Sequence, residues 1–264
     1  MTIFDSHAHY DDGRFEREYD GGNIQALRDA KRAGVEYVVN SGADIETSRA
    51  SIALAELNGD DMPSIYASVG IHPTETGRCG TLSEAIDEIR RLAHEQRVVA
   101  IGEIGLDYHY PDTDKDTQRE FFAAQLELAR ELNMPVVIHD RDAHGDVYDI
   151  VQNFRDVRMM MHCYSGSAEM ARQYAKWGVH FSFGGVLTYK NAQKTREAAS
   201  AIPRELLMLE TDAPYLSPVP HRGKINSSAY MVHTAEMMGE VLGMSAEDTA
   251  SLTTENAKRF YNIQ

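Results

Sequence analysis

The amino-acid sequence predicts an α/β protein with the (β/α)₈ (TIM) barrel fold, formed as a single domain by residues 1–264. Short apolar, β-branched segments alternate eight times with longer segments of helical periodicity, and this is the element order of such a barrel. A chain of 264 residues also has the size of these barrels, which is typically about 250 residues. No glycine-rich phosphate-binding loop follows the first strand, which weighs against a doubly wound open sheet.

The eight apolar segments are predicted to be parallel strands, and the segments between them to be helices. The predicted strands are residues 2–6, 37–40, 64–70, 98–101, 136–138, 159–162, 180–182 and 206–209. The predicted helices are residues 24–33, 45–57, 82–94, 117–132, 143–154, 167–177 and 192–201, followed after the last strand by 230–242 and 246–260.

Residues typical of helix ends support these boundaries. Gly34 and Gly178 follow the first and sixth helices, where a C-terminal cap favours a residue that accepts positive φ. Asn133 ends the fourth helix just before a Met-Pro pair. Ser245 with Asp248 resembles a capping box in which Asp replaces Glu.

Composition excludes several classes of protein. Hydrophobic residues make up 42% and charged residues 25% of the chain, a globular composition that excludes a disordered or fibrous protein. The net charge of −15 disfavours broad nonspecific binding to duplex DNA, which needs Lys and Arg to neutralise phosphates. Two cysteines, Cys79 and Cys163, are too few for a disulfide framework. With no long apolar run and no signal-type N-terminus, a cytoplasmic protein with no membrane partner is predicted.

Polar side chains gather where the predicted strands end. His7 and His9 share one face of the first strand because side chains alternate, with Asp5 below them on the same face. In a barrel all carboxyl ends of the strands meet at the catalytic face. The residues expected together at this mouth are His7, His9, Glu103, His139, His162 and Asp212.

Four imidazoles and two carboxylates suit a divalent ion such as Zn²⁺, Mn²⁺ or Mg²⁺. Taken singly, each of these residues has a simpler explanation as a turn or surface residue. Together they exceed what one tetrahedral site needs, and they suit two metal ions about 3.5–4 Å apart with one carboxylate bridging. The predicted cofactors are therefore two divalent metal ions. His72 ends the third strand before a proline and is a further candidate, for contact with substrate.

Several stretches resemble the TatD-type metal-dependent deoxyribonucleases, which belong to the amidohydrolase-like TIM barrels. They run from one end of the chain to the other and are, in order, Asp5-Ser6-His7-Ala8-His9, Gly70-Ile71-His72-Pro73, Ala100-Ile101-Gly102-Glu103-Ile104-Gly105-Leu106-Asp107-Tyr108, Gln118-Arg119-Glu120-x-Phe122, Leu132-Asn133-Met134-Pro135-Val136-Val137-Ile138-His139, Asp140-Arg141-Asp142-Ala143, His162-Cys163-Tyr164-Ser165-Gly166, Leu209-Glu210-Thr211-Asp212-Ala213-Pro214-Tyr215-Leu216 and Thr254-Glu255-Asn256-Ala257.

The resemblance implies a hydrolase that cleaves phosphodiesters with one or two divalent ions. By position it implies the same six metal ligands that the strand ends indicate. It further implies that Glu103 is the bridging carboxylate, that Asp212 holds a metal and takes a proton from the attacking water, and that His72 lies near the substrate phosphate. Glu103 and Asp212 are thus the predicted catalytic residues.

One stretch departs from the family pattern. The family usually carries Arg-Gly-Lys-x-Asn-Glu-Pro after the eighth strand, whereas this chain has Arg-Gly-Lys-Ile-Asn-Ser-Ser at 222–228. The basic part remains, so Arg222 and Lys224 are candidates for holding a phosphate, together with Arg141. We interpret Ser227 and Ser228 as the replacement start of a helix, because Ser is a good N-cap.

The sequence therefore predicts a metal-dependent hydrolase, a deoxyribonuclease and most simply an exonuclease. The predicted partner is DNA, as a single strand or a duplex end, because a barrel mouth does not easily admit an intact duplex. Two alternatives stay open. The same ligand set serves hydrolysis of a small ester, amide or phosphoester in related barrels, and a metal-dependent binding protein without turnover would need the loss of a ligand, which this chain does not show.

Overall fold

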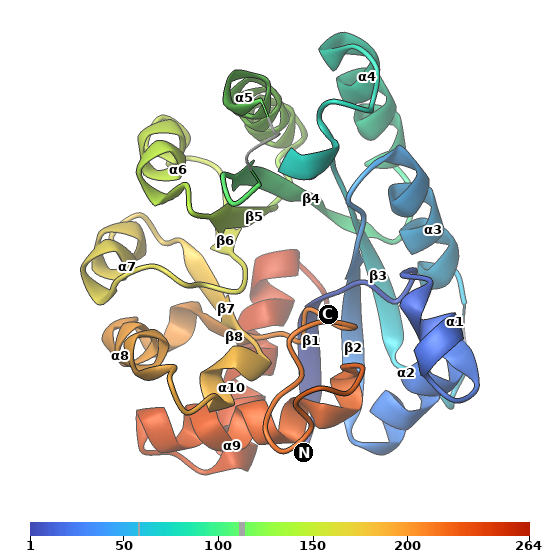
Figure 1. Cartoon of the computed structure of the whole chain (residues 1–264), viewed down its shortest axis with the longest axis vertical. Helices are drawn as coiled ribbons and strands as arrows, with labels where there is room; N and C mark the ends of the chain where they lie inside the picture. Colours follow the sequence, from blue (N-terminus) through green and yellow to red (C-terminus); the bar gives the residue numbers. More distant parts are fainter. Residues whose placement is uncertain (58, 111–113) are drawn as a thin grey trace.

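The computed structural model describes residues 1–57, 59–110 and 114–264. Eight parallel strands form one sheet in which each strand lies next to its predecessor, in the order β1 to β8 (Figure 1). The predicted (β/α)₈ barrel is confirmed. The strands are β1 Ile3–Ala8, β2 Val35–Ser41, β3 Ser64–Val69, β4 Val98–Asp107, β5 Val136–Arg141, β6 Met159–Met161, β7 His180–Phe183 and β8 Leu207–Leu209.

The main difference from the predicted strands is the length of β4. The prediction ends this strand at Ile101, but it continues to Asp107, so that Glu103 lies inside the strand. Gly105 is needed there because a Cβ on it would lie 2.0 Å from the carbonyl oxygen of His139 on β5. The two glycines of this stretch thus permit a close approach of two strands rather than a turn.

The first and last strands are joined by bonds at the mouth of the barrel. The hydroxyl of Ser6 donates to the carbonyl of Leu209 at 2.9 Å. The amide of Asp212 donates to the carbonyl of His7 at 3.0 Å, and the amide of His9 donates to the carbonyl of Ala213 at 2.7 Å. These bonds hold the loop after β8 against β1, and they bring Asp212 to His7 and His9.

Helices surround the sheet, and every predicted helix is present with ends within three residues of the prediction. They are α2 Gly22–Arg32, α3 Ile45–Ala55, α4 Leu82–Leu92, α5 Lys115–Leu132, α6 His144–Val151, α7 Ala168–Ala175, α8 Gln193–Ala201, α9 Met231–Leu242 and α10 Ala246–Tyr261. The prediction missed α1 Arg14–Glu18 and the short 3₁₀ turns η1 Pro73–Glu75, η2 Gly185–Thr188, η3 Arg204–Leu206 and η4 Ser228–Tyr230.

The predicted helix ends have the expected backbone geometry. Gly34 and Gly178 have φ of 93° and 74°, and Asn133 ends α5 with φ of 52°. Ser245 caps α10 by accepting from the amide of Asp248. The Asp248 carboxylate accepts from the hydroxyl of Ser245 at 2.7 Å, which makes a single cap rather than the reciprocal box that was predicted.

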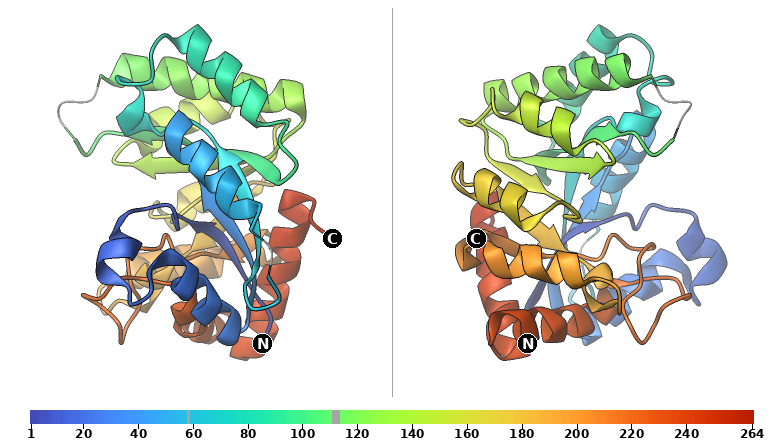
Figure 2. Two further views of the ribbon diagram at one scale, coloured as in Figure 1. Left: turned by 90° about the vertical axis from the view of Figure 1, so that its right-hand side faces the viewer. Right: turned by 60° about the vertical axis from the view of Figure 1, so that its left-hand side comes forward.

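The C-terminal helix α10 packs against the end of the barrel opposite the mouth, as both views in Figure 2 show. Inward side chains of β1, β2, β4, β5, β6 and β8 fill the barrel and contact Phe260 and Tyr261 of this helix. The hydroxyl of Tyr261 donates to the carbonyl of Ser6 at 2.8 Å. The opposite end is therefore plugged by apolar packing, which leaves the mouth as the end where a site can form.

Among the described residues, none of the helices combines the length and the apolar character that crossing a membrane requires.

Candidate metal centre

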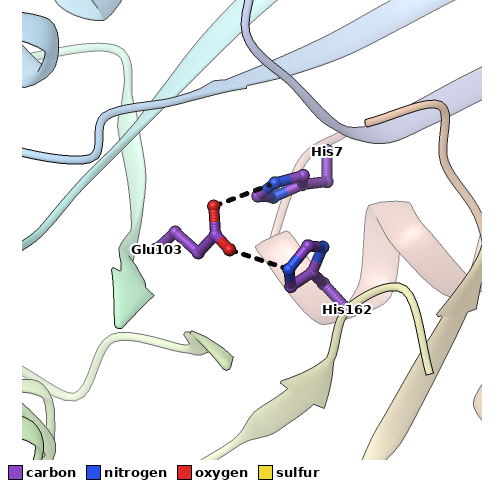
Figure 3. Close-up of side chains that lie close together, drawn as sticks. All are labelled: His7, Glu103 and His162. Carbon is purple, nitrogen blue, oxygen red and sulfur yellow. Dashed lines mark ion pairs between the residues drawn. The ribbon is translucent and has the colours of Figure 1, made fainter. Parts of the chain in front are cut away.

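Glu103 of β4 lies between two pairs of histidines. Its Oε2 is 3.3 Å from Nε2 of His7 in β1 and 3.5 Å from Nε2 of His9, which directly follows β1. Its Oε1 is 2.7 Å from Nδ1 of His139 on β5 and 2.8 Å from Nε2 of His162 after β6. Figure 3 shows the two oxygens turned toward His7 and His162. One carboxylate thus faces a donor pair on each side, as a bridging ligand does.

Asp212, from the loop after β8, completes the first donor group. Its Oδ1 lies 3.4 Å from Nε2 of His9 and 3.6 Å from Nε2 of His7. Ligand atoms of these three residues lie within 4.8 Å of one another. His7, Glu103 and His162 form a second such group. The structure therefore brings together all six residues that the sequence predicts as metal ligands.

The backbone carbonyl and the hydroxyl of Ser41, the last residue of β2, orient His9 and His7. Nδ1 of His9 lies 2.9 Å from the Ser41 carbonyl, so Nδ1 carries the proton and Nε2 presents a lone pair. Nδ1 of His7 lies 2.9 Å from the Ser41 hydroxyl. The His9 lone pair faces Glu103 and Asp212, an arrangement that is repulsive unless a proton or a metal ion lies between these groups. The donor set therefore fits a divalent cation.

Two buried carboxylates lie behind the second pair of histidines. Nε2 of His139 is 3.1 Å from Oδ2 of Asp107, which leaves Nδ1 to face Glu103. Nδ1 of His162 is 3.7 Å from Oε2 of Glu210, and this oxygen also accepts from the hydroxyl of Ser182. Carboxylates behind metal-binding histidines hold the ring orientation and raise the basicity of the ligand.

The sequence prediction did not assign Ser41, Asp107 or Glu210 to the site. A weak signal exists for Asp107, which is four residues after Glu103 in one strand and so shares its face. Glu210 directly follows β8, and strand alternation does not extend to it. No signal in the sequence marks Ser41, whose role depends on the register of β2 against β1.

The electrostatic environment favours ionised carboxylates at the centre. Burial raises the pKa of Glu103, but the surrounding imidazoles of His162, His72 and His7 outweigh it and hold the pKa well below the usual value. Burial opposes ionisation of Asp212 as well, and His9 lowers its pKa nonetheless. Two ionised carboxylates among imidazoles create a strongly cation-attracting position at the base of the mouth.

Asp5 does not lie beneath the histidine rings as the alternation of β1 predicts. Its carboxylate accepts from the amide of Thr211 at 2.9 Å, from the hydroxyl of Thr211 at 2.6 Å and from the hydroxyl of Ser228 at 2.5 Å. The register between β1 and β2 shifts between Asp5 and Ala8, which breaks the alternation. Burial raises the pKa of Asp5 to about 7, and its bonds tie β1 to the loop after β8.

Ser227 and Ser228, where the chain departs from the family pattern, belong to this same set of contacts between β1 and the segment after β8. Ser227 is the N-cap of η4, and its side chain accepts from the amide of Ala229, which confirms the predicted capping role. Ser228 does more than the prediction states, because its hydroxyl also lies 2.7 Å from that of Tyr10 and donates to Asp5. The pair therefore supports the loop that carries Asp212.

A cavity of about 610 Å³ opens above the candidate centre. His72 lines this cavity, and its Nε2 lies 3.5 Å from Oε1 of Glu103. Burial and the neighbouring His139 lower the pKa of His72 to about 3. Arg141 also lines the cavity. Arg222 lies over the ring of Tyr189 at 4.2 Å. Neither Arg222 nor Lys224 is among the described residues of the cavity wall.

Comparison with known proteins identifies the family to which the chain belongs. The family model described as TatD related DNase matches residues 4–262. The chain belongs to the TatD-related DNase family. It is similar to the metal-dependent hydrolase YabD of Bacillus subtilis, with 40% identity over 99% of both chains. It is also similar to the metal-dependent hydrolase YcfH of Escherichia coli K12, with 35% identity over 100% of this chain and 97% of the relative.

Solved structures of TatD proteins share the fold. The TatD homologue YjjV of Escherichia coli K12 superposes with a TM-score of 0.89 at 27% identity, over 99% of this chain and 98% of that one. A TatD-family hydrolase of Entamoeba histolytica superposes with a TM-score of 0.83 at 22% identity, over 98% of both chains, and shows the fold alone. Family and fold together make this TatD-family chain a metal-dependent hydrolase.

Proposed function

We propose that this TatD-family hydrolase is a deoxyribonuclease that removes nucleotides from the ends of DNA strands. The observation that carries the proposal is Glu103, whose two carboxylate oxygens each face a pair of histidine nitrogens. Such an arrangement suits two divalent ions held about 3.5–4 Å apart, and pairs of this kind serve the in-line displacement of phosphodiesters.

Two sets of residues would hold the ions. His7, His9 and Asp212 would bind one, His139 and His162 the other, and Glu103 both. Zn²⁺, Mg²⁺ and Mn²⁺ all accept such ligands. When bound, such ions supply Lewis-acid activation of a water and charge stabilisation at the phosphoryl oxygens.

The other roles belong to side chains of the chain itself. Asp212 is ionised and lies at the edge of the first donor group, so it is placed to accept a proton from the attacking water. His72 is neutral, because burial lowers its pKa to about 3, and it can donate a hydrogen bond to a phosphate oxygen. Arg141, from the end of β5, lines the same cavity and supplies a charge that suits phosphate.

The shape and charge of the molecule favour DNA ends over intact duplex. A cavity of about 610 Å³ falls in the range of small-ligand pockets, so it accepts about one or two nucleotides rather than a double helix. The net charge of −15 opposes extended contact with a phosphate backbone. A single strand or a frayed duplex end meets both conditions.

The test is cleavage of an end-labelled single-stranded oligonucleotide in the presence of Mg²⁺ or Mn²⁺, followed by addition of a chelator. Asp212→Asn protein, purified in parallel, controls for contaminating nucleases. The proposal expects a ladder of products that disappears with the chelator and is reduced at least 100-fold by the substitution. DNA left intact by metal-loaded protein, together with turnover of small esters or cyclic amides, would point instead to a small-molecule hydrolase.

A further inference from the structure

The cavity above the candidate metal centre has a second, apolar wall that the proposed chemistry does not use. Phe183, Val186 and Leu187 line it from β7 and η2, and Tyr215 and Leu216 line it from the loop after β8. Tyr215 is 43% exposed and Leu216 is 38% exposed. Large apolar side chains exposed beside a site indicate contact with a ligand.

Tyr215 is held in place on several sides. Its hydroxyl donates to the carboxylate of Asp12, and the guanidinium of Arg14 lies over its ring at 5.4 Å from the centroid. The ring centroid is 6.4 Å from that of His9, a member of the first donor group. A ring oriented in this way loses little conformational freedom when it binds a planar partner.

Leu216 has a backbone conformation that is unusual for a residue of its type. Its φ is 54°, in the left-handed region that costs an ordinary residue about 1–2 kcal/mol, and its side chain is exposed. Val219 of the same loop is similarly exposed, at 44%, but it does not line the cavity. Strained residues kept at a pocket wall are typical of ligand contacts.

We propose that Tyr215 and Leu216, backed by Val186 and Leu187, form a subsite that stacks the nucleobase of the terminal nucleotide. The ligand is a nucleotide because the two parts of the cavity match its two chemical parts. The cation-binding end suits the phosphate, and the apolar wall beside it suits the faces of the base. The rings of Tyr215 and His9 are neighbours, with 6.4 Å between their centroids, so the apolar wall adjoins the cation-binding end. This inference rests on the proposed nuclease function and names the substrate part that the site recognises.

Stacking of this kind has a measurable consequence. Base–aromatic stacking favours binding at every base because each base has a π face. Metal-loaded protein should therefore bind deoxyadenosine monophosphate about tenfold more tightly than 2-deoxyribose 5-phosphate, which has the phosphate and sugar but no base. Isothermal titration calorimetry measures both affinities. Equal affinities would overturn the subsite.

Substitutions in the apolar wall test whether it causes the preference for the ligand that carries a base. Tyr215→Ala should remove most of the difference between the two ligands while leaving the affinity for the sugar phosphate unchanged. Tyr215→Phe keeps the ring and should preserve the preference. Leu216→Asn removes apolar surface with a residue that accepts positive φ, and should weaken the preference without unfolding the loop. Val219→Ala is the matched control and should change nothing. A preference unaffected by both Tyr215→Ala and Leu216→Asn would contradict the assignment.

A cleavage assay separates failure of the subsite from failure of the nuclease function. Oligonucleotides with a normal or an abasic terminal nucleotide are compared, and the abasic end should be removed at least tenfold more slowly, chiefly through KM. Equal cleavage of both ends would refute the subsite and leave the nuclease intact. No cleavage of either, with a retained preference for the nucleoside monophosphate in calorimetry, would refute the nuclease while the base-binding wall stands.

Discussion

Asp107 shows how a residue outside the predicted ligand set can still shape the site. It is 1% exposed, and its carboxylate lies 3.1 Å from Nε2 of His139. That contact selects which ring nitrogen of His139 faces Glu103.

We expect Asp107→Ala to weaken metal binding about 10–100-fold at the position that His139 helps to form, because its ring loses the partner that orients it. Titration of the apo protein with Zn²⁺ in a competing chelator measures this affinity. Asp116→Ala changes an exposed carboxylate at the start of α5 and is the matched control. Unchanged Zn²⁺ affinity in the Asp107 variant would show that the contact is incidental.

The residues that sequence alone could place are those whose position depends on one strand. His7, His9, His139, His162 and Asp212 each follow an apolar segment, and barrel geometry then brings them together. Ser41, Asp107 and Glu210 could not be placed in this way, because their contacts depend on register between strands and on side-chain direction. Arg222 was selected from a matching stretch of sequence, and its side chain lies on Tyr189, so its phosphate contact stays a prediction.

At the scale of elements, α10 explains why the barrel has one functional end. Its position as the last helix was predictable from periodicity, but its packing across the barrel was not, because periodicity identifies an apolar face without its partner. Phe260 is 1% exposed and lies 5.0 Å from the ring of His180 and 4.8 Å from that of Tyr261.

Phe260→Ala should lower the free energy of unfolding by about 3–5 kcal/mol, because it leaves a cavity where the helix closes the barrel. Urea denaturation followed by circular dichroism measures the loss. Glu255→Ala, at an exposed position of the same helix, should change stability by less than about 0.5 kcal/mol. A Phe260 variant as stable as wild type would mean that α10 does not close the barrel in solution.

The length of β4 also depended on a neighbouring element. In isolation, Gly102 and Gly105 indicate the end of a strand. In the fold they lie within the strand, because the absence of a Cβ lets β5 approach it closely. Only the pairing partner distinguishes these two meanings of glycine. The same extension places Glu103, which lies beyond the predicted strand end at Ile101, in the middle of β4, where a bridging ligand is held rigidly.

At the scale of the whole molecule, His180 links stability to pH far from the mouth. It begins β7 at the end that α10 covers, and burial lowers its pKa to about 4. The unfolded chain, with a histidine pKa near 6.5, therefore binds a proton that the folded chain does not bind between these values. The contribution of neutral His180 to the free energy of unfolding is therefore fully present above about pH 6.5, and it is lost as the pH falls toward 4.

Wild-type protein should lose about 2 kcal/mol of unfolding free energy between pH 7 and pH 5 through His180. The difference between wild type and His180→Leu isolates this part from the titration of carboxylates, since both proteins share the latter. Urea unfolding at several pH values gives the two curves. Parallel curves for the two proteins would show that His180 has an ordinary pKa in the fold.

We infer that Glu103 joins two metal positions, one on each side of its carboxylate. Crystals grown with Mn²⁺, and anomalous differences collected from them, locate the bound ions. We expect two anomalous peaks about 3.5–4 Å apart, one beside His7, His9 and Asp212 and one beside His139 and His162, each in contact with an oxygen of Glu103. Glu103→Gln should lose at least one peak while the histidines remain. Metal bound at a position that Glu103 does not contact would contradict the account.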